Sequence, residues 1–256
     1  MSTVPCENIN PYSSGDGTDK TSQVRAMFNN IAPAYDFMNK AMTLGIDRLW
    51  RRKAVKMIAK ERPRHVLDVA TGTGDMAINL ARHCSAGIIG IDLSAGMIDV
   101  GRHKVSEAGL DSRVSFKLGD CLDLPFEDNS FDCISVAFGV RNFEHLSQGY
   151  ENMLRVLRPG GMLLVLELST PASPLVRPFY NIYTRCLIPF VGKMVSHDAQ
   201  AYTYLPKSIA AVPQRLDMTS LMERAGFVDT HYESLTLGVC TLYTARKPDY
   251  KKQIIK

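Results

Sequence analysis

The sequence predicts an α/β fold: one doubly wound, mostly parallel sheet of seven strands that closes with an antiparallel hairpin. A helical cap is expected before the sheet, and an insertion after its fifth strand. Three observations lead to this prediction. Short, almost uninterrupted apolar runs alternate with helical segments, the pattern of a parallel sheet covered on both faces. A glycine-rich turn, ATGTGD, follows the first of these runs. Two strand-like runs meet near residues 237–238, close to the end of the chain.

The chain before the sheet divides into two parts. Residues 1–20 are rich in Ser, Gly, Asn and Pro, so we expect a flexible leader. Residues 21–62 have a helical pattern that is broken near Pro33 and Gly45, and the last helix ends before Pro63. This second segment is predicted to form an N-terminal helical cap.

Residues 63–247 carry the sheet. Strands are predicted at residues 65–70, 87–92, 113–120, 131–138 and 162–168. The helices between them are predicted at residues 75–84, 94–108 and 145–157. One helix near residues 208–225 then leads to the hairpin, FVDTHYESLTLGVCTLYTARK, which places one antiparallel strand in an otherwise parallel sheet. Residues 248–256 form a tail.

The insertion covers residues 170–206 and contains the stretch PFYNIYTRCLIPFVGKMV. This stretch is apolar and aromatic, but Pro178, Arg185, Pro189 and Gly192 interrupt it. Two interpretations stay open, and one segment can satisfy both. In the first, the insertion is a cap or a subunit contact of a homo-oligomer with an ordinary packing role. In the second, its apolar side chains face a greasy substrate or a membrane surface.

Composition and charge narrow the function classes. The formal net charge of +4 is too small an excess to predict nucleic-acid binding, although it suits weak attraction to an anionic membrane surface. The six cysteines are scattered without a C-x-x-C pair, so neither a metal site nor a disulfide framework is expected. Free cysteines suit a reducing compartment, so we expect a cytoplasmic location. The first residues lack the apolar core of a secretory signal, and no run of about 18 apolar residues exists to span a bilayer.

The stretch LDVATGTGDMA, residues 67–77, predicts a nucleotide-like binding site. A buried strand ends in a turn in which Gly72 and Gly74 let a ligand approach the backbone closely. A helix opens at Asp75, and its amino end adds exposed N–H donors. Taken with Ala77, the same glycines also match the dinucleotide fingerprint G-x-G-x-x-A, so the loop alone leaves the cofactor class open.

Three acidic residues in or after the predicted strands suit parts of a nucleoside cofactor, although the role expected of Asp92 fits either cofactor class. Asp68 lies inside the first strand, where a carboxylate suits a cation such as the methionyl ammonium of S-adenosylmethionine; the alternative is a carboxylate that holds the loop amides. Asp92 ends the second strand and is predicted to accept hydrogen bonds from ribose hydroxyls. The alternative, capping of the next helix, is a role for which Ser94 is well placed. Asp120 follows the third strand and suits the amino group of adenine, with the Cys121 N–H directed to a ring nitrogen.

Apolar side chains near these carboxylates predict the walls of an adenine site. Leu93, Met97 and Leu122 are expected to enclose the ring, and for Met97 and Leu122 an ordinary core position is the alternative. The predicted cofactor is therefore S-adenosylmethionine. No cluster of metal ligands accompanies it, so no metal is expected.

A resemblance to the class I S-adenosylmethionine-dependent methyltransferases, which have a Rossmann-like fold, is carried by LDVATGTGD, GIDLS, GDCLDLPFEDNSFDCI and RVLRPGGMLLVLEL. Two stretches narrow it: YDFMNKAMTLGIDRLWR and RVLRPGGMLLVLELS look like the paired signatures of the menaquinone/ubiquinone biosynthesis C-methyltransferase family. The likeness extends over nearly the whole chain after Lys20. The first signature departs from its common form at Met42 and Thr43, where Leu and Ser are usual, and at Asp47, where His or Gln is usual.

This resemblance implies methyl transfer from S-adenosylmethionine to a ring carbon of a polyprenylated quinol, with demethylmenaquinol to menaquinol as the favoured reaction. The benzoquinol precursor of ubiquinone and another small apolar acceptor are the alternatives. The family's cofactor contacts correspond here to Thr73, Asp92, Asp120 and Cys121, whereas a serine that is frequent before F-G-x-R-N is Ala137. A prenylated substrate also implies transient, peripheral contact with the inner face of the cytoplasmic membrane.

The chemistry requires a ring hydroxyl to lose its proton, so the site needs a base or a cation that stabilises the phenolate. Arg141 and Asn142 follow the fourth strand, at the edge where ligands bind in open α/β sheets. We predict that Arg141 acts on the ring oxygen electrostatically and that Asn142 orients the ring or a water. The alternative is an ion pair of Arg141 with Glu144 or Glu167. Tyr35 is predicted to close over the acceptor as a hydrogen-bond partner or as part of a lid.

Other functions and other bases remain as alternatives. A methyltransferase for a soluble acceptor is opposed by the apolar insertion, and a nucleotide-dependent dehydrogenase is opposed by the terminal hairpin and Asp68. A non-catalytic protein that keeps the cofactor fold is the third alternative. His145 and His197 are outside candidates for a base, although a lone histidine that opens a helix is more often a cap or a surface group.

Overall fold

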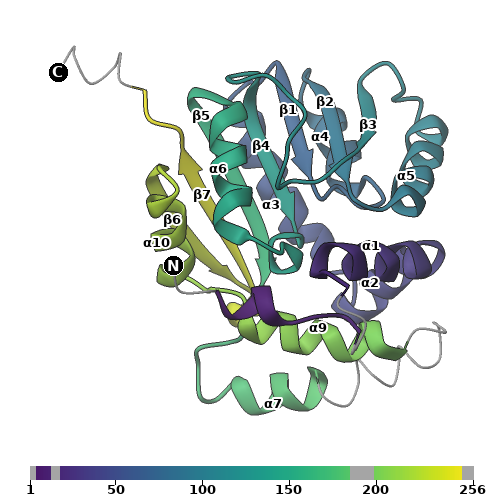
Figure 1. Cartoon of the computed structure of the whole chain (residues 1–256), viewed down its shortest axis with the longest axis vertical. Coiled ribbons are helices and arrows are strands. Elements are labelled where there is room, and N and C mark those ends of the chain that lie inside the picture. Colours follow the sequence, from purple (N-terminus) through teal and green to yellow (C-terminus); the bar gives the residue numbers. More distant parts are fainter. Residues whose placement is uncertain (1–3, 13–17, 185–198, 250–256) are drawn as a thin grey trace.

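A computed structural model of the chain describes residues 4–12, 18–184 and 199–249, without the side chains of residues 199–202. The described residues form one seven-stranded sheet with helices on both faces, so the predicted fold class is confirmed (Figure 1). The strands are β1 (His65–Val69), β2 (Gly87–Asp92), β3 (Val114–Leu118), β4 (Phe131–Ala137), β5 (Leu157–Leu168), β6 (Val228–Leu235) and β7 (Cys240–Arg246).

The strand order is β3-β2-β1-β4-β5-β7-β6. The first five strands pair in parallel, whereas β7 pairs antiparallel with both β5 and β6. The chain reverses in the 3₁₀ turn η5 (Thr236–Gly238), where Leu237 and Gly238 have φ values of 57° and 89°. The hairpin therefore contributes one antiparallel strand to an otherwise parallel sheet, as predicted.

Both faces of the sheet are covered, which leaves its carboxyl edge as the place for a ligand. Leu67 and Val69 of β1 pack in a core with α6 (Leu146–Val156) and α10 (Leu216–Arg224). Val66, between them and on the opposite face, packs in a second core with α3 (Asp47–Lys60) and α4 (Asp75–His83). This alternation follows from the two-residue period of a strand.

The N-terminal cap lies across the carboxyl edge of the sheet. It consists of α1 (Lys20–Ile31), the 3₁₀ turn η2 (Ala32–Ala34), α2 (Tyr35–Thr43) and α3. The predicted breaks are present, because Pro33 lies in η2 and Gly45 has a φ of 75°. Met27 and Met38 of the cap pack with Met97 of α5 (Ala95–Glu107) and with Tyr204 of α9 (Ala199–Ala211). Cap and insertion therefore meet at this edge (Figure 1).

Residues 4–12 correct the expectation of a flexible leader. They contain the 3₁₀ turn η1 (Pro5–Asn8), and Cys6 is fully buried in the core beside α6. The Glu7 carboxylate accepts a hydrogen bond from the Leu146 N–H, the first in α6, at 2.7 Å. The segment is held by one small buried side chain, Cys6, and by the hydrogen bond of Glu7 to the start of α6. So few contacts leave no signal in a composition rich in polar residues. The remainder of the expected leader, residues 1–3 and 13–17, lies outside the described residues.

The single helix expected near residues 208–225 is two helices, which is the second correction. Helix α9 ends at Ala211 and α10 begins at Leu216. Pro213 lies between them; it has no N–H to donate, and it disfavours helical geometry at the residue before it. Arg215 then takes a φ of 54° and restarts the chain in a new direction. In the insertion, α7 (Arg177–Ile182) is described, whereas residues 185–198, with His197, are not.

Candidate active site

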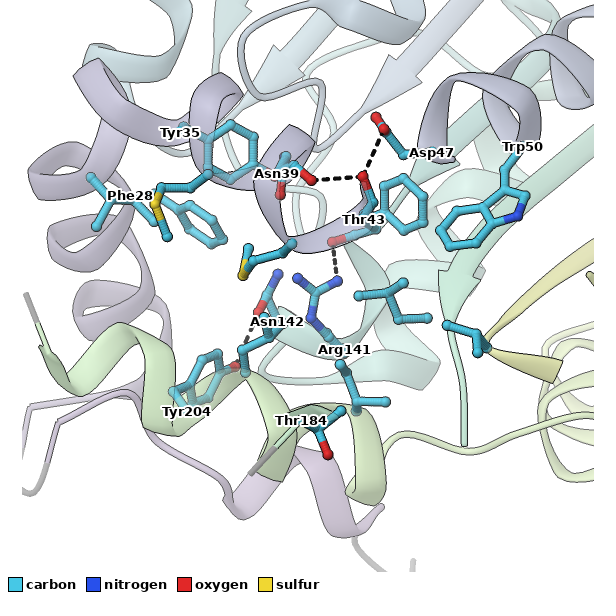
Figure 2. Close-up of a pocket in the computed structure, with 18 of the residues that line it drawn as sticks. Phe28, Tyr35, Asn39, Thr43, Asp47, Trp50, Arg141, Asn142, Thr184 and Tyr204 are labelled. Atoms are coloured by element: carbon cyan, nitrogen blue, oxygen red, sulfur yellow. Dashed lines mark hydrogen bonds between the residues drawn. The ribbon is translucent and has the colours of Figure 1, made fainter. Parts of the chain in front are cut away.

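Two adjoining cavities lie at the carboxyl edge of the parallel strands, beneath the cap. The strand-end pocket, of about 670 Å³, lies where β1 to β4 end and is roofed by α1. The cap pocket, of about 1000 Å³, lies among α1 to α3, the 3₁₀ turn η3 (Val140–Asn142), α7 and α9 (Figure 2). Phe28, Tyr35, Phe138 and Asn142 line both cavities, so the two cavities have a common wall.

The structure brings six of the nine predicted cofactor-binding residues into the strand-end pocket. They come from the turns after the first three strands and from the first turn of α5. These residues are Gly72, Asp92, Leu93, Met97, Asp120 and Cys121. Leu122, the third expected wall of an adenine site, packs at the edge of the core instead.

Asp92 joins the second strand to the glycine loop. One carboxylate oxygen accepts from the Gly72 N–H at 2.8 Å, and the other from the Ser94 N–H at 2.9 Å. Burial raises the pKa of Asp92. The cap of α5 is Ser94, whose hydroxyl accepts from the Met97 N–H at 3.1 Å. Each carboxylate oxygen has a second lone pair, so Asp92 keeps acceptor capacity toward the pocket that it lines.

Asp120 and Cys121 form the edge of the strand-end pocket after β3. The Asp120 carboxylate accepts from the Leu122 N–H at 2.9 Å, which fixes the turn. Burial raises the pKa of the Cys121 thiol well above its ordinary value, so this cysteine stays a neutral thiol. Among the described residues, no three His, Cys, Asp or Glu side chains come together as metal ligands would.

Asp68 is one residue that the structure does not place on the pocket wall. Its carboxylate accepts from the hydroxyls of Thr71 and Ser135, both at 2.6 Å, and it is 1% exposed. Burial raises its pKa to about 6. Ser135 is its register partner on β4, so the sequence spacing could not reveal this contact. In this arrangement Asp68 holds the glycine loop through the Thr71 hydroxyl, whereas the alternative interpretation expected it to hold the loop amides.

Thr73 faces the cap rather than the strand-end pocket. Its hydroxyl donates to Asp36 of α2 at 2.5 Å and accepts from the Lys104 ammonium at 3.1 Å. The same ammonium donates to Asp36 and to Asp75, each at 2.6 Å. These four side chains, which we call the cap latch, join the cap, the glycine loop, α4 and α5.

Gly74 serves packing at the start of α4. Its φ of 79° lies in the left-handed region, and a Cβ there would lie 2.6 Å from the ring of Phe116. A side chain at this position would therefore displace β3 or α4 from their contact. This accounts for the second glycine of the loop without a ligand.

Arg141 lines the cap pocket and is held by Glu167 of β5. The Arg141 guanidinium donates to the Glu167 carboxylate at 2.8 Å and to the carbonyl oxygen of Phe138. The backbone N–H of Arg141 donates to the same carboxylate at 3.3 Å. Burial acts to lower the pKa of Arg141, but Glu167, Tyr35 and Tyr204 together outweigh burial and raise it, so the side chain stays a cation. The Nε atom is buried without a hydrogen-bond partner. The ion pair with Glu167, which was the alternative, is thus present, and Arg141 also lines the cap pocket.

Asn142 and Tyr35 complete the predicted catalytic group. The Tyr204 hydroxyl of α9 donates to the Asn142 side-chain oxygen at 3.1 Å (Figure 2). Tyr35 stands edge-on to Phe28, with ring centres 6.0 Å apart, and burial raises its pKa, so its hydroxyl stays protonated. His145, the outside candidate for a base, is exposed and lines neither pocket.

A second buried arginine in the cap pocket was missed by sequence reasoning. Arg51 of α3 lies over the Phe138 ring at 4.9 Å and pairs with Asp47 at 3.5 Å. The Asp47 carboxylate accepts from the Thr43 hydroxyl at 2.8 Å. Like that of Arg141, the Nε of Arg51 has no hydrogen-bond partner. In the sequence, Arg51 is one of four neighbouring basic residues, Arg48, Arg51, Arg52 and Lys53. Its separation of four residues from Asp47 was the available signal.

The insertion supplies the aromatic wall of the cap pocket. Tyr180 and Tyr183 lie on or just after α7, Thr184 follows them, and Tyr204 lies on α9. Burial raises the pKa of Tyr180 to about 12, so its hydroxyl also stays protonated at neutral pH. The aromatic composition of residues 170–206 left a packing role and a substrate-facing role open and did not indicate which rings would line the pocket.

Comparison with known proteins places this architecture in a family. The model of the ubiE/COQ5 methyltransferase family matches residues 17–247. The demethylmenaquinone methyltransferase of Bacteroides fragilis is 50% identical over 245 residues, which cover 95% of this chain and 99% of that protein. The ubiquinone/menaquinone biosynthesis C-methyltransferase UbiE of Geobacter sulfurreducens is 43% identical, with 90% of each chain covered.

Solved structures share the fold at low sequence identity. The [4+2]-cyclase SpnF is 19% identical and superposes with a TM-score of 0.67 over 92% of this chain and 100% of its own. A phosphoethanolamine N-methyltransferase of Haemonchus contortus in complex with S-adenosyl-L-methionine is 16% identical, with a TM-score of 0.58, over 77% of this chain and 52% of its own. The similarity to curated relatives goes further than fold. It confirms the resemblance carried by the two signatures, and the chain therefore belongs to the ubiE/COQ5 methyltransferase family.

Proposed function

We propose that this chain transfers the methyl group of S-adenosylmethionine to a ring carbon of a polyprenylated quinol and converts demethylmenaquinol to menaquinol. The observation that carries the proposal is the common wall of the two cavities. The strand-end pocket offers carboxylates to a nucleoside, and the cap pocket offers aromatic and apolar side chains with a buried cation, Arg141, to a quinol. The demethylmenaquinone methyltransferase of Bacteroides fragilis, at 50% identity, supports the choice of acceptor.

The strand-end pocket fits S-adenosylmethionine by its donor set. Asp92 is suited to the ribose hydroxyls, Asp120 and the Cys121 N–H to adenine, and Leu93 and Met97 to the faces of the ring. The bound cofactor supplies an electrophilic methyl group. The task of the protein is then to align a ring carbon with that group and to make the carbon nucleophilic.

Arg141 is proposed to make the ring carbon nucleophilic through its charge. An arginine stays protonated, so it stabilises the phenolate oxygen rather than removing the proton itself, which passes to solvent. A carbon–carbon bond forms as the carbon–sulfur bond breaks, which leaves S-adenosylhomocysteine, and the ring carbon then loses its proton to solvent, which restores aromaticity. Asn142, fixed by Tyr204, orients the ring, and Tyr35 closes the common wall beside it.

Peripheral contact with the inner face of the cytoplasmic membrane is part of the proposal. Among the described residues, no helix combines the length and the apolarity needed to cross a bilayer. Phe179 and Ile182 are 75% and 64% exposed, at a spacing that puts them on one side of α7, and Leu175, in the turn before α7, is 81% exposed. Sedimentation with vesicles of neutral and of anionic lipid tests this contact. A chain that stays in the supernatant with both would contradict it.

The function is tested by the products of the purified protein. Demethylmenaquinol, the benzoquinol precursor of ubiquinone and a tail-less quinol are each incubated with S-adenosylmethionine, and the products are measured by mass. Methylation of the first with the best kcat/KM supports the proposal. Preference for the benzoquinol would favour the ubiquinone pathway, a possibility that the name of the Geobacter sulfurreducens relative includes. Equal use of the tail-less quinol would indicate a soluble acceptor, and cofactor binding without any methylation would indicate a non-catalytic protein.

A further inference from the structure

Lys20 is a buried cation that the proposed reaction does not use. It is the first residue of α1 and is 3% exposed. Its ammonium donates three hydrogen bonds: to the carbonyl oxygens of Cys6 at 2.7 Å, Phe143 at 3.0 Å and Arg141 at 3.3 Å. An ammonium has three N–H donors, so every one is used, and every acceptor is a neutral backbone group.

The nearby carboxylates have other partners. Glu7 and Glu144 act on Lys20 through their charge, but Glu7 accepts from the N–H groups of Val4 and Leu146. Glu144 accepts from the N–H and the hydroxyl of Thr21, at 3.1 and 2.6 Å. Burying a cation without a bonded anion is unfavourable, and burial accordingly lowers the pKa of Lys20. An apolar side chain would fill this space without that cost, so the ammonium's particular contribution is its hold on three carbonyl groups.

Two of those carbonyl groups flank Asn142. Arg141 and Asn142 end the 3₁₀ turn η3, which is three residues long, and Phe143 follows it. Carbonyl groups at the end of a short helical turn have no partner within the turn and require one from outside. The side chains of Arg141 and Asn142 point from this turn into the cap pocket (Figure 2). The orientation of the turn therefore sets the positions of both.

We propose that Lys20 is a positioning residue for methyl transfer: its ammonium fixes the backbone on both sides of Asn142 and so aligns Arg141 in the cap pocket and Asn142 at the common wall. This inference rests on the proposed function. Lys20 itself lines neither pocket, so its replacement is expected to act on turnover rather than on cofactor affinity.

The test uses the full-length chain with Lys20→Met, which removes the donors and keeps the length of the side chain, and Lys20→Gln, which keeps two donors. The matched control is Asp19→Ala. Asp19 caps the same helix by accepting from the Ser22 N–H at 2.6 Å, and it is exposed and touches neither pocket. The Asp19→Ala substitution weakens the start of α1 and leaves the hydrogen bonds to the carbonyl groups of η3 in place.

We expect kcat to fall about 10- to 100-fold in Lys20→Met and less in Lys20→Gln, because a small misplacement of catalytic groups costs that much. The KM for the quinol and the Kd for S-adenosylhomocysteine should stay within about threefold, and Asp19→Ala should retain its kcat. An unchanged kcat in both Lys20 variants would overturn the proposal. So would a loss of kcat that Asp19→Ala reproduces. Should Lys20→Met not fold, Lys20→Gln alone decides in the same way.

Hydrogen exchange separates this inference from the proposed function. The Asn142 and Phe143 N–H groups donate within the turn, to Gly139 at 3.0 Å and Val140 at 3.2 Å. With S-adenosylhomocysteine present, their exchange should be faster in Lys20→Met than in the wild type and unchanged in Asp19→Ala. Faster exchange in a chain that methylates no quinol would refute the function and leave the hold of Lys20 on η3 standing. Unchanged exchange would refute that hold.

Discussion

Arg141 has two neighbours with opposite implications: a carboxylate that stabilises it in the folded chain and a cavity in which it can act on a substrate. Glu167, which is 1% exposed, binds it through both the guanidinium and the backbone. Removing Arg141 therefore changes stability and catalysis together. Any test of its role has to separate the two.

Arg141→Ala should lower kcat about 10²- to 10³-fold while the Kd for S-adenosylhomocysteine changes little. It should also lower the free energy of unfolding by about 3–5 kcal/mol, because Glu167 becomes a buried carboxylate that has lost its counter-ion and keeps only backbone N–H donors. The double variant Arg141→Met with Glu167→Gln removes both charges and should recover much of the stability. Turnover and urea unfolding are measured on all three chains. A double variant that recovers activity together with stability would show that Arg141 is only structural.

Asp68 should give the folded chain a measurable dependence on pH. Burial raises its pKa from 3.8 to about 6, so the folded chain holds the proton more tightly than the unfolded chain does. The carboxylate therefore costs stability at pH 7, by up to about 3 kcal/mol, and this cost disappears as the pH falls from about 6 to 4. Relative to Asp68→Asn, the wild type should gain free energy of unfolding between pH 7 and pH 5. A difference that does not change with pH would contradict this.

The same residue provides a test of its predicted contact with the methionyl ammonium. A bound ammonium close to Asp68 would lower its pKa, so S-adenosylhomocysteine binding near pH 6 should release a proton. Calorimetry in two buffers of different ionisation enthalpy measures this release, with Asp68→Asn as the control. Equal proton release from both chains would show that Asp68 does not contact the ammonium and only holds the glycine loop.

Individual side chains were predictable where their role follows from the chain around them. Asp92 and Ser94 end a strand and begin a helix, and local spacing was enough to place both. Asp68 and Thr73 were not predictable in this way, because their partners, Ser135 and Asp36, are 67 and 37 residues away in the sequence. A contact across a sheet or between cap and loop leaves no periodic signal.

At the scale of elements, the strands could be predicted from the hydrophobic pattern and the breaks in the cap from proline and glycine. The helices in and after the insertion could not be predicted in this way. The buried strands are apolar on both faces, and Pro33 and Gly45 interrupt the helical pattern of the cap. The separation of α9 from α10 depends on Pro213 and on the positive φ of Arg215. The sequence offered only the first of these as a signal, and α9 itself continues through Pro206.

The cap latch should govern how long the cofactor product stays bound. Lys104 joins α5 to Asp36 of the cap and to Asp75, both of which are more than one-third exposed. Lys104→Met should therefore cost at most about 1 kcal/mol of stability, yet raise the dissociation rate of S-adenosylhomocysteine several-fold. Arg102→Met removes an exposed ion pair with Asp99 on the same helix and is the matched control. Equal dissociation rates in the two variants would rule out the latch.

At the scale of the whole molecule, the sheet topology was predictable, and the enclosure of the site was not. Alternating strands and helices allow few arrangements, and the terminal hairpin specified the antiparallel strand. The cap pocket is built from two regions, residues 27–51 and 138–239, that are distant in the sequence. Nothing in the local sequence of α1 or α7 indicates that they lie around one cavity.

Docking of the N-terminal segment onto the whole fold can be followed through Cys6. Burial raises the pKa of the Cys6 thiol to about 11, and of the described cysteines only Cys84 is not buried. In a chain with Cys84→Ser and Cys186→Ser, an aromatic disulfide reagent should label slowly in the native state. Labelling should become faster in Lys20→Met, since Lys20 bonds the Cys6 carbonyl. Fast labelling of the parent chain would show that residues 4–12 do not stay docked.

The common wall of the two cavities has a consequence for how much methyl donor is hydrolysed without product. Three of its four side chains are aromatic rings, and the fourth is an amide already bonded to Tyr204. A wall of this composition offers water few hydrogen-bond partners, so we expect it to keep water away from the reacting sulfur. The chain should therefore consume almost no methyl donor until an acceptor arrives, and donor spent should equal product made.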